Sequence, residues 1–350
     1  MNIMTKLYPL KMKPIYKEIL WGGQSLASLY ERKLPFEKTA ESWEASAHRN
    51  GCSTVEAGAL SGENLVQLAK EYKEDFLGSL CDVQEGFPLL LKLIDACDFL
   101  SVQVHPDDEL AKLDNDKGKT EMWIVLCAKE NAGLYMGFNR DITKEEYKKR
   151  ISDNTLKEVL NFVPAKAGDV FYIAAGTVHA IGAGLVIAEI QQNSDTTYRV
   201  YDWGRVGKDN KPRELHIDKA LEASTLEKYS PKAQIACIMS ASTKISYYPC
   251  CKYFGAVKQE IAEEYNDYTN KKSFHILFCS EGEGEIKADG NSHSIKAGET
   301  YIIPACVERY QIKGKLTVYK FFVPDFNEDY LLPLEKAGVS QAVIDSLNNI

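Results

Sequence analysis

The chain has 350 residues, a formal net charge of -8 at pH 7, 45% hydrophobic and 26% charged residues. This composition is typical of a soluble globular protein, and the negative charge disfavours nucleic acids and anionic membrane surfaces as partners. Residues 1–21 carry lysines throughout without an apolar signal core, and no apolar stretch approaches the roughly 20 residues that cross a bilayer. We therefore expect a cytoplasmic protein with no membrane or nucleic-acid partner.

The nine cysteines include no C-x-x-C pair, which is typical of reduced thiols in a cytosolic protein and argues against a zinc ribbon. The length of the chain favours two domains over one.

Helical patterns are few and short. Apolar residues at helical spacing predict a helix over roughly 63–77. Thr143-x-x-Glu146 and Thr155-x-x-Glu158 have the form of capping boxes, so we expect one or two helices within roughly 144–161. A short helix near 216–226 and a terminal helix over 341–347 complete the set.

Strand patterns make up most of the remaining chain. β-Branched and aromatic residues form strand-length runs at 125–126, 170–173 and 185–187. Strand character resumes after Pro231 and continues to about Val323. The pattern predicts a mainly β protein.

The sequence contains an internal repeat. Residues 166–175 (KAGDVFYIAA) align with residues 296–305 (KAGETYIIPA), and both read as a turn, a buried strand and a second turn. In this alignment His179 of the first copy falls opposite Arg309 of the second. We therefore expect a duplicated unit whose second copy lacks a metal ligand.

Gln103 and His105 are the first candidates for a metal site. They lie two positions apart in the run LSVQVHP (100–106), so an extended strand would present both side chains on one face. Glu121 and His179 follow downstream. One amide, one carboxylate and two imidazoles form a nitrogen and oxygen ligand set that suits zinc and not thiolate chemistry. A single strand histidine is ordinarily a packing residue, so the interpretation depends on the surrounding sequence.

Several ordered motifs resemble type I mannose-6-phosphate isomerases, of the short bacterial form, in the cupin superfamily. They are WGG (21–23), ESWE (41–44), LKLIDA (91–96), SVQVHP (101–106), GKTE (118–121) and QQNSDTTYRVYD (191–202). The resemblance implies two cupin-type jelly-roll β-barrels with short inserted α-helices. Residues 1–230 would form the metal-binding catalytic domain, with its helical insertions at 63–77 and 144–161, and residues 231–350 a cupin-like domain without a metal site.

The resemblance also implies roles for individual residues. Gln103, His105, Glu121 and His179 match the four ligands of one zinc ion per chain. One departure is present, because many relatives have the run HKPE where this chain has GKTE, so the histidine of that run is absent.

The remaining matches concern the substrate. Lys119 and Ser101 match phosphosugar-binding positions, while Arg199 and Asp195 match a catalytic arginine and the aspartate four residues before it. Lys119 would also take part in catalysis. On the polar pattern alone, Arg199 could equally be a solvated strand residue or the ion-pair partner of Asp195.

The implied reaction interconverts mannose 6-phosphate and fructose 6-phosphate by proton transfer through an enediol. The dication would act as a Lewis acid and Arg199 as a second electrophile. Asp195, Glu44, Lys119 and a zinc-bound water all remain candidates for the proton-transferring group.

Two other functions fit a metal-binding cupin. A metal-dependent oxygenase would favour iron and more histidines, which the glutamine and single carboxylate argue against. A non-catalytic metal-dependent sugar sensor would not need Arg199 and Lys119 alongside all four ligands. We expect a small phosphosugar as the partner and no obligate protein partner.

Overall fold

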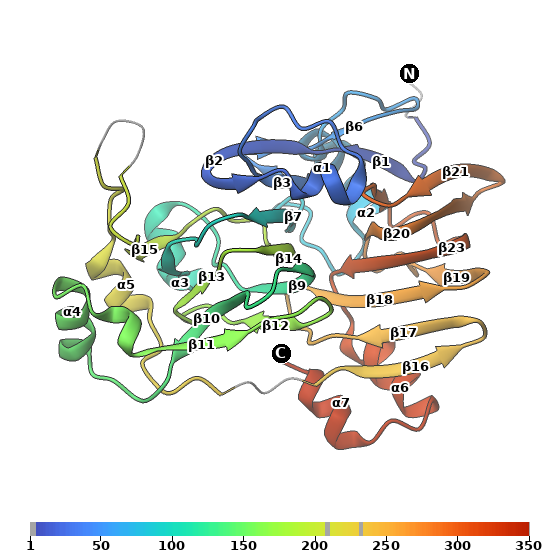
Figure 1. Ribbon diagram of the computed structural model, residues 1–350. Coiled ribbons are helices and arrows are strands. Elements are labelled where there is room, and N and C mark those ends of the chain that lie inside the picture. The colour runs from blue at the N-terminus through green and yellow to red at the C-terminus, as the bar shows by residue number, and fades with distance from the viewer. Residues whose placement is uncertain (1–4, 207–210, 231–233, 350) are drawn as a thin grey trace.

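The computed structural model describes residues 5–206, 211–230 and 234–349. Within those ranges it contains 23 strands and seven α-helices, and the ladders that join the strands into sheets are antiparallel (Figure 1). The prediction of a mainly β protein is confirmed. No helix in the described ranges has both the length and the apolar character needed to cross a membrane.

Two sheets make up most of the N-terminal half. The six-stranded sheet has the order β12 (Val170–Ile173), β9 (Glu121–Ala128), β14 (Leu185–Gln192), β7 (Leu89–Ala96), β3 (Thr39–Ala45) and β2 (Ile15–Gly23). The five-stranded sheet has the order β11 (Leu160–Pro164), β10 (Gly133–Phe138), β13 (His179–Ile181), β8 (Val102–Val104) and β15 (Tyr198–Tyr201). Side chains of both sheets, among them Ile94, Trp123 and Met136, share one buried cluster, so the two sheets pack face to face.

The C-terminal half is built on a ten-stranded sheet. Its main path is β16 (Ala236–Ser240), β17 (Thr243–Tyr247), β18 (Gly255–Ile261), β23 (Arg309–Phe322), β20 (His275–Ala288), β22 (Thr300–Ile303), β1 (Leu10–Lys13) and β6 (Thr54–Val55). Strand β19 (Glu264–Tyr268) pairs with β23, and β21 (Asn291–Lys296) with β20. The N-terminal strand β1 thus completes a C-terminal sheet, as the blue strand beside the red ones shows in Figure 1. Strands β4 (Ala47–His48) and β5 (Gly51–Cys52) form a separate hairpin.

The helices are short. They are α1 (Ser25–Tyr30), α2 (Leu65–Leu77), α3 (Asp108–Ala111), α4 (Lys144–Ser152), α5 (Ile217–Ala223), α6 (Leu332–Lys336) and α7 (Gln341–Leu347). The predicted helix over 63–77 is confirmed as α2, where Asn64 and Gln67 form a capping box. The predicted helices near 216–226 and over 341–347 are confirmed as α5 and α7.

The prediction for residues 144–161 is confirmed only in its first half. Thr143 caps α4 by accepting a hydrogen bond from the backbone of Glu146. The second capping box is wrong: Thr155 makes no side-chain cap, and only a 3₁₀ turn (Leu156–Glu158) follows. The chain has no room for a longer helix because β11 begins at Leu160 and pairs with β10.

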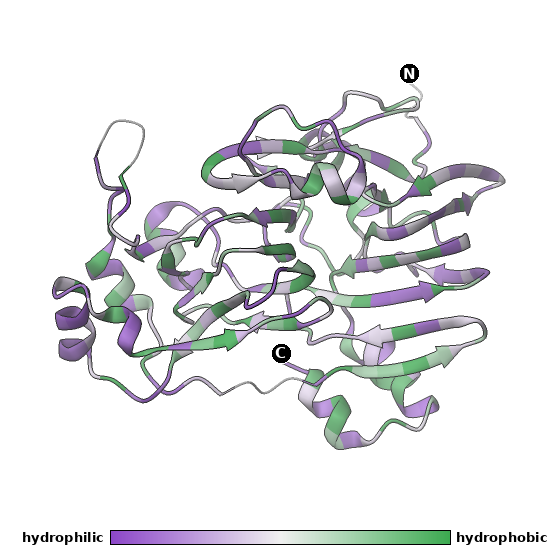
Figure 2. Ribbon diagram, in the orientation of Figure 1, coloured by the Kyte–Doolittle hydropathy of each residue, from purple (hydrophilic) through white to green (hydrophobic). Residues whose placement is uncertain are grey.

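The largest buried cluster joins the two halves of the molecule. It combines Leu91 and Leu93 of β7 with Ile276 and Phe321 of the ten-stranded sheet. Figure 2 shows the corresponding hydrophobic residues alternating with polar ones along many of the strands. Because side chains alternate across a strand, Lys92 between the two leucines points to the opposite face, toward the five-stranded sheet. A charged residue is thereby placed inside the N-terminal half.

The two copies of the internal repeat have the same local structure. Each has a glycine at positive φ in its first turn, Gly168 at 90° and Gly298 at 84°, and continues into a strand, β12 or β22. The copies differ where the alignment places His179 opposite Arg309, since the histidine is fully buried and the arginine is exposed.

Candidate metal centre

Strand pairing brings four predicted ligands together at one end of the two N-terminal sheets. Gln103 on β8 lies directly opposite His179 on β13, and His105 follows the end of β8. Glu121 is the first residue of β9. The residues are up to 76 positions apart in sequence, and the antiparallel ladders place them side by side.

The side-chain atoms converge. Nε2 of His179 lies 3.3 Å from Oε1 of Glu121, and Nε2 of His105 lies 3.5 Å from Oε2 of the same carboxylate. The amide Nε2 of Gln103 lies 3.3 Å from Nε2 of His179. One ligand atom from each of His105, Glu121 and His179 lies within 4.8 Å of the others, a spacing that can hold a metal ion.

Backbone carbonyls fix the orientation of both imidazoles. Nδ1 of His105 lies 3.0 Å from the Thr196 carbonyl oxygen, and Nδ1 of His179 lies 2.8 Å from that of Thr177. A carbonyl can only accept, so each Nδ1 carries the proton and each Nε2 presents its lone pair. This is the tautomer that a metal ligand requires.

Glu121 supplies a buried carboxylate whose Oε2 lies 2.9 Å from the Lys119 ammonium. Its side chain is fully buried, and neither oxygen has a hydrogen-bond partner of acceptable geometry among the described residues. Such a group is costly to bury unless a cation accompanies it. The donor set of two imidazoles, one amide and one carboxylate fits a zinc ion.

The pKa values follow from burial. Burial, followed by the charge of Glu189, raises the pKa of Glu121 to about 7. Burial lowers the pKa of His179 to about 4, and burial with the neighbouring Lys119 holds the pKa of His105 well below its usual value. Both imidazoles are therefore neutral at pH 7, with a lone pair on each Nε2.

Lys119 lies among the ligands. Its Nζ is 2.9 Å from Oε2 of Glu121, 3.0 Å from Nε2 of His105 and 4.0 Å from Oε1 of Glu189. The side chain is buried, as is that of Ser101, which precedes β8. The sequence predicts that both residues bind the substrate. Lys119 contacts two of the predicted ligands, and Ser101 lies two residues before Gln103 in the sequence.

Arg199 lies on β15, directly opposite Gln103. Its Nη1 donates to the Glu214 carbonyl oxygen at 3.0 Å, while its buried Nε has no partner among the described residues. In residues 5–206, 211–230 and 234–349 no ion pair joins Arg199 to Asp195. Asp195 instead accepts a hydrogen bond from Asn50 at 2.7 Å, and Lys92 and this bond outweigh burial to lower the pKa of its carboxyl.

Glu44, on β3, contacts residues outside the group of predicted ligands. Its carboxylate pairs with Arg32 at 2.6 Å and accepts a hydrogen bond from Thr300 of the C-terminal sheet at 2.8 Å. It is therefore part of the contact between the two halves.

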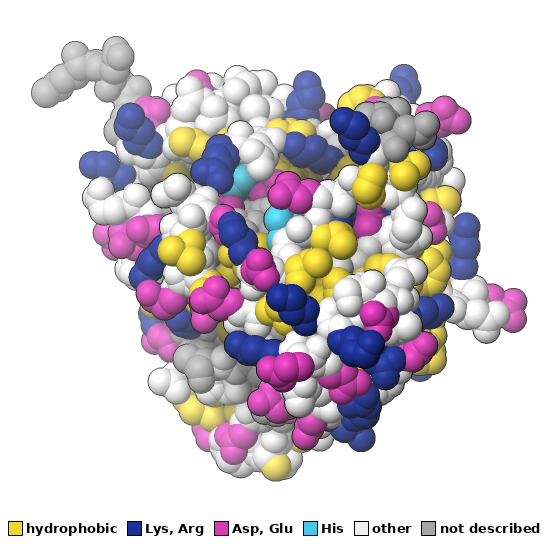
Figure 3. All heavy atoms as spheres, turned by 90° about the vertical axis from the view of Figure 1, so that its left-hand side faces the viewer, with side chains coloured by type: hydrophobic (Ala, Val, Ile, Leu, Met, Phe, Trp, Pro, Cys, Tyr) yellow, Lys and Arg dark blue, Asp and Glu magenta, His cyan; other side chains and the backbone are white. Residues whose placement is uncertain are grey.

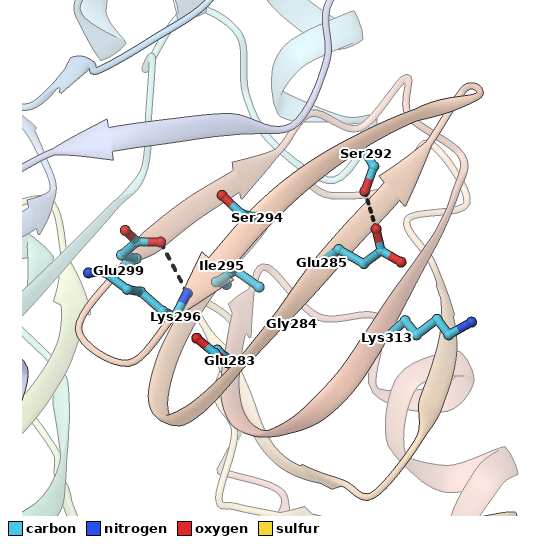
Figure 4. Close-up of a pocket in the computed structure, with 9 residues that line it drawn as sticks. All are labelled: Glu283, Gly284, Glu285, Ser292, Ser294, Ile295, Lys296, Glu299 and Lys313. Atoms are coloured by element: carbon cyan, nitrogen blue, oxygen red, sulfur yellow. Dashed lines mark hydrogen bonds between the residues drawn. The ribbon is translucent and has the colours of Figure 1, made fainter.

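Two surface cavities differ in their relation to this centre. A cavity of about 270 Å³ beside it is lined by Asp195, Thr196 and His216, among others, and Thr196 is the residue that orients His105. Figure 3 shows histidine side chains between acidic and basic ones in a hollow of the molecular surface. A second cavity, of about 610 Å³, lies on β20 and β21 (Figure 4). There the Ser292 hydroxyl donates a hydrogen bond to Glu285, and the backbone N–H of Lys296 donates one to Glu299. None of the predicted site residues lines it.

Comparisons with known proteins show the family to which the chain belongs. Residues 9–120 match the family described as phosphomannose isomerase type I, catalytic domain, and residues 244–323 match the mannose-6-phosphate isomerase cupin domain. The chain is 38% identical over 315 residues to the probable mannose-6-phosphate isomerase GmuF of Bacillus subtilis, covering 88% of this chain and 96% of the relative. The chain belongs to the type I phosphomannose isomerase family.

Further relatives extend the match. The mannose-6-phosphate isomerase ManA of Bacillus subtilis is 36% identical over 314 residues, which is 87% of this chain and 96% of that protein. The crystal structure of the mannose 6-phosphate isomerase from Bacillus subtilis superposes with a TM-score of 0.85 at 34% identity and covers 89% of this chain and 99% of that one. The catalytic-domain match ends at residue 120, so the placement of Glu121, His179 and Arg199 depends on the structure.

Gly118 explains why this chain departs from the HKPE run of many family members. A Cβ atom added at this position would lie 2.6 Å from the backbone nitrogen of Asp108. The loop therefore leaves no space for a histidine side chain at this position.

Sequence reasoning missed Lys92 and Glu189. Their side chains are 3% exposed and lie 3.4 Å apart beside Lys119, and Trp123 donates to Glu189 at 2.9 Å. Burial alone would lower the pKa of Lys92, but Glu41 and Glu189 outweigh it and raise that pKa. The available signal was a single lysine inside the otherwise apolar run Leu89–Ile94.

Proposed function

We propose that this protein is a zinc-dependent aldose–ketose isomerase that interconverts mannose 6-phosphate and fructose 6-phosphate by proton transfer through an enediol. The observation that carries the proposal is the convergence of the buried His105, Glu121 and His179 on one point, in a chain of this family. The names of the relatives supply the substrate.

Gln103, His105, Glu121 and His179 would hold one zinc ion. The Gln103 amide can present its oxygen to the same point after a half-turn, because amide oxygen and nitrogen occupy equivalent positions. When bound, the zinc supplies Lewis-acid stabilisation of charge on the sugar oxygens.

Protein side chains would perform the remaining steps. Arg199, Asp195 and Lys119 are the proposed catalytic residues, and Ser101, Lys119 and Arg199 would bind the phosphosugar. The Nε of Arg199, which has no hydrogen-bond partner among the described residues, supports this role, since it can donate to an enediolate oxygen without giving up an existing bond. The ammonium groups of Lys119 and Lys92 lie within 4.0 Å of Glu189, so local positive charge accompanies the buried carboxylates.

We further propose that residues 1–230 form the catalytic domain and residues 231–350 a cupin-like domain without a metal site. Both would have jelly-roll topology, and the protein would act in the cytoplasm without an obligate protein partner. The pairing of β1 with β22 means that the two domains are joined by backbone hydrogen bonds as well as by side chains.

A coupled assay for formation of fructose 6-phosphate from mannose 6-phosphate tests the proposal. We expect turnover by the zinc-loaded protein, its loss in excess chelator and its return on adding zinc. Binding of the phosphosugar without turnover would instead support the sugar sensor. Turnover that persists in chelator, with zinc shown to be removed, would contradict the zinc-dependent mechanism.

A further inference from the structure

The segment between β8 and β9 carries Lys119 and is held by a small hydrogen-bond network. Oδ1 of Asp108 accepts from the backbone of Gly118 at 3.1 Å and from Nε2 of Gln192 at 2.9 Å. Oε1 of Gln192 in turn accepts from the backbone of Thr120 at 3.0 Å. Gly118 and Thr120 flank Lys119. Asp108 thus holds the first of them, and its partner Gln192 holds the second.

The network does not end in the N-terminal half. Oδ2 of Asp108 accepts a hydrogen bond from the hydroxyl of Tyr253 at 2.5 Å, across 145 positions of sequence. Tyr253 lies in the turn between β17 and β18 of the ten-stranded sheet. In this turn the backbone N–H of Cys251 donates to the carbonyl oxygen of Phe254 at 3.0 Å. Burial would raise the pKa of the Asp108 carboxyl, but hydrogen bonds from Tyr253, Gln192 and Gly118 outweigh it and lower that pKa. Asp108 is therefore a charged acceptor, for which such bonds are strong.

The loop has little freedom to absorb a shift of Asp108. Gly118 packs so closely against the backbone of Asp108 that even a Cβ atom would not fit between them. The backbone of Lys119 also donates to the Pro106 carbonyl oxygen at 3.0 Å, which closes the segment. A displacement at Asp108 would consequently move the backbone from which the Lys119 side chain projects.

We propose that Tyr253 is a positioning residue for the active site. Its hydroxyl holds Asp108, and through Gly118 and Gln192 it keeps Lys119 within reach of His105 and Glu121. This inference rests on the isomerase function proposed above. It assigns the C-terminal half a role in catalysis beyond structural support.

Replacing Tyr253 with phenylalanine tests the role, because the change removes one hydroxyl and keeps the ring. We expect kcat for mannose 6-phosphate to fall about tenfold, in line with loss of a hydrogen bond to a charged group. KM should rise less than about threefold, because two of the three proposed phosphosugar-binding residues, Ser101 and Arg199, lie outside this network. Chelator competition should show zinc affinity within about threefold of wild type, and the melting temperature should stay within about 3 °C.

The matched control is Tyr301→Phe, which removes a tyrosine hydroxyl of the same sheet that donates to Ser294 at 2.7 Å, away from the network. We expect its kcat to equal that of wild type. If Tyr253→Phe leaves kcat unchanged, or lowers it no more than the control does, the positioning role is excluded. A wild-type protein without turnover would refute the isomerase function, which is a distinguishable result.

A second variant covers the case in which Tyr253→Phe folds poorly. Asp108→Asn keeps an acceptor for the Gly118 amide and removes the charged partner of Tyr253. We expect it to lower kcat by a similar factor, and the double variant to lower kcat no further than either single one, as for residues acting through one network. Independent, multiplicative losses would overturn the proposal.

Discussion

Lys92 and Glu189 form a buried ion pair across neighbouring strands. The residues are in direct register between β7 and β14, and Nζ lies 3.4 Å from Oε1. The same ammonium lies 5.1 Å from the ring centre of Trp43, so it is enclosed by acidic and aromatic groups. This pair sets the charge balance beside the metal ligands.

Lys92→Met should destabilise the protein strongly. Removing one partner of a buried pair leaves the other uncompensated, which costs about 3–5 kcal/mol of unfolding free energy. Urea denaturation of zinc-loaded protein measures the change. Lys17→Met is the control, since that half-buried lysine lies 4.3 Å from the ring centre of the same tryptophan and should cost about 1 kcal/mol or less. Equal losses in the two variants would contradict a specific Lys92–Glu189 pair.

Zinc should stabilise the protein through His179. A ligand at 100 times its dissociation constant adds about 2.7 kcal/mol to the unfolding free energy. We expect the melting temperature to rise when zinc is added to chelator-treated wild type and not to rise for His179→Ala. An equal rise in both proteins would place the metal elsewhere.

Arg199→Ala should lower kcat by at least about 10²-fold, the scale of losing a fixed charge partner of the transition state. Arg199→Lys should recover only part of this loss, because an ammonium lacks the planar donor geometry of guanidinium. Arg150→Ala, on the exposed helix α4, is the control and should have wild-type kcat. A steady-state assay showing full activity of Arg199→Ala would remove this residue from the mechanism.

Glu44→Gln should affect stability and leave turnover intact. The buried Arg32 loses its ionic partner, so the unfolding free energy should fall by about 3 kcal/mol. Activity measured well below the melting temperature should stay within about twofold of wild type. A tenfold loss of kcat in a variant that melts normally would return Glu44 to the proton-transfer candidates.

His275 should make the stability of the protein dependent on pH. Burial, then the charge of Lys320, lowers its folded-state pKa to about 3, and it faces Tyr310, Asp267 and Lys320 inside the C-terminal sheet. The unfolded chain takes up this proton near pH 6.5 and the folded chain does not. The stability is therefore full above about pH 6.5 and is lost as pH falls toward 3, by at most about 1.4 kcal/mol per pH unit.

Denaturation of wild type and His275→Gln at pH 7, 6 and 5, both with chelator, checks this expectation. The stability advantage of wild type should shrink by about 1–2 kcal/mol between pH 7 and pH 5. An advantage that is independent of pH would show that His275 does not titrate differently in the two states.

The amino-acid sequence alone determined the class of fold, the main helices and the four candidate ligands. These properties are local: helical spacing predicted α2, strand parity put Gln103 and His105 together, and the ordered motifs pointed to the family. The second capping box failed because tertiary pairing of β11 with β10 took the residues that a helix would have needed.

Only the tertiary structure decided which polar residues meet. Glu44 and Glu189 look alike in sequence, yet one faces the C-terminal half and the other the metal ligands, because strand faces alternate and sheets pack on both sides. Lys92 and Tyr253 are similarly ordinary in sequence. Glu189, which pairs with Lys92, and Asp108, which accepts from Tyr253, are each more than 90 positions away, so strand register and packing, and not any local pattern, bring these pairs together.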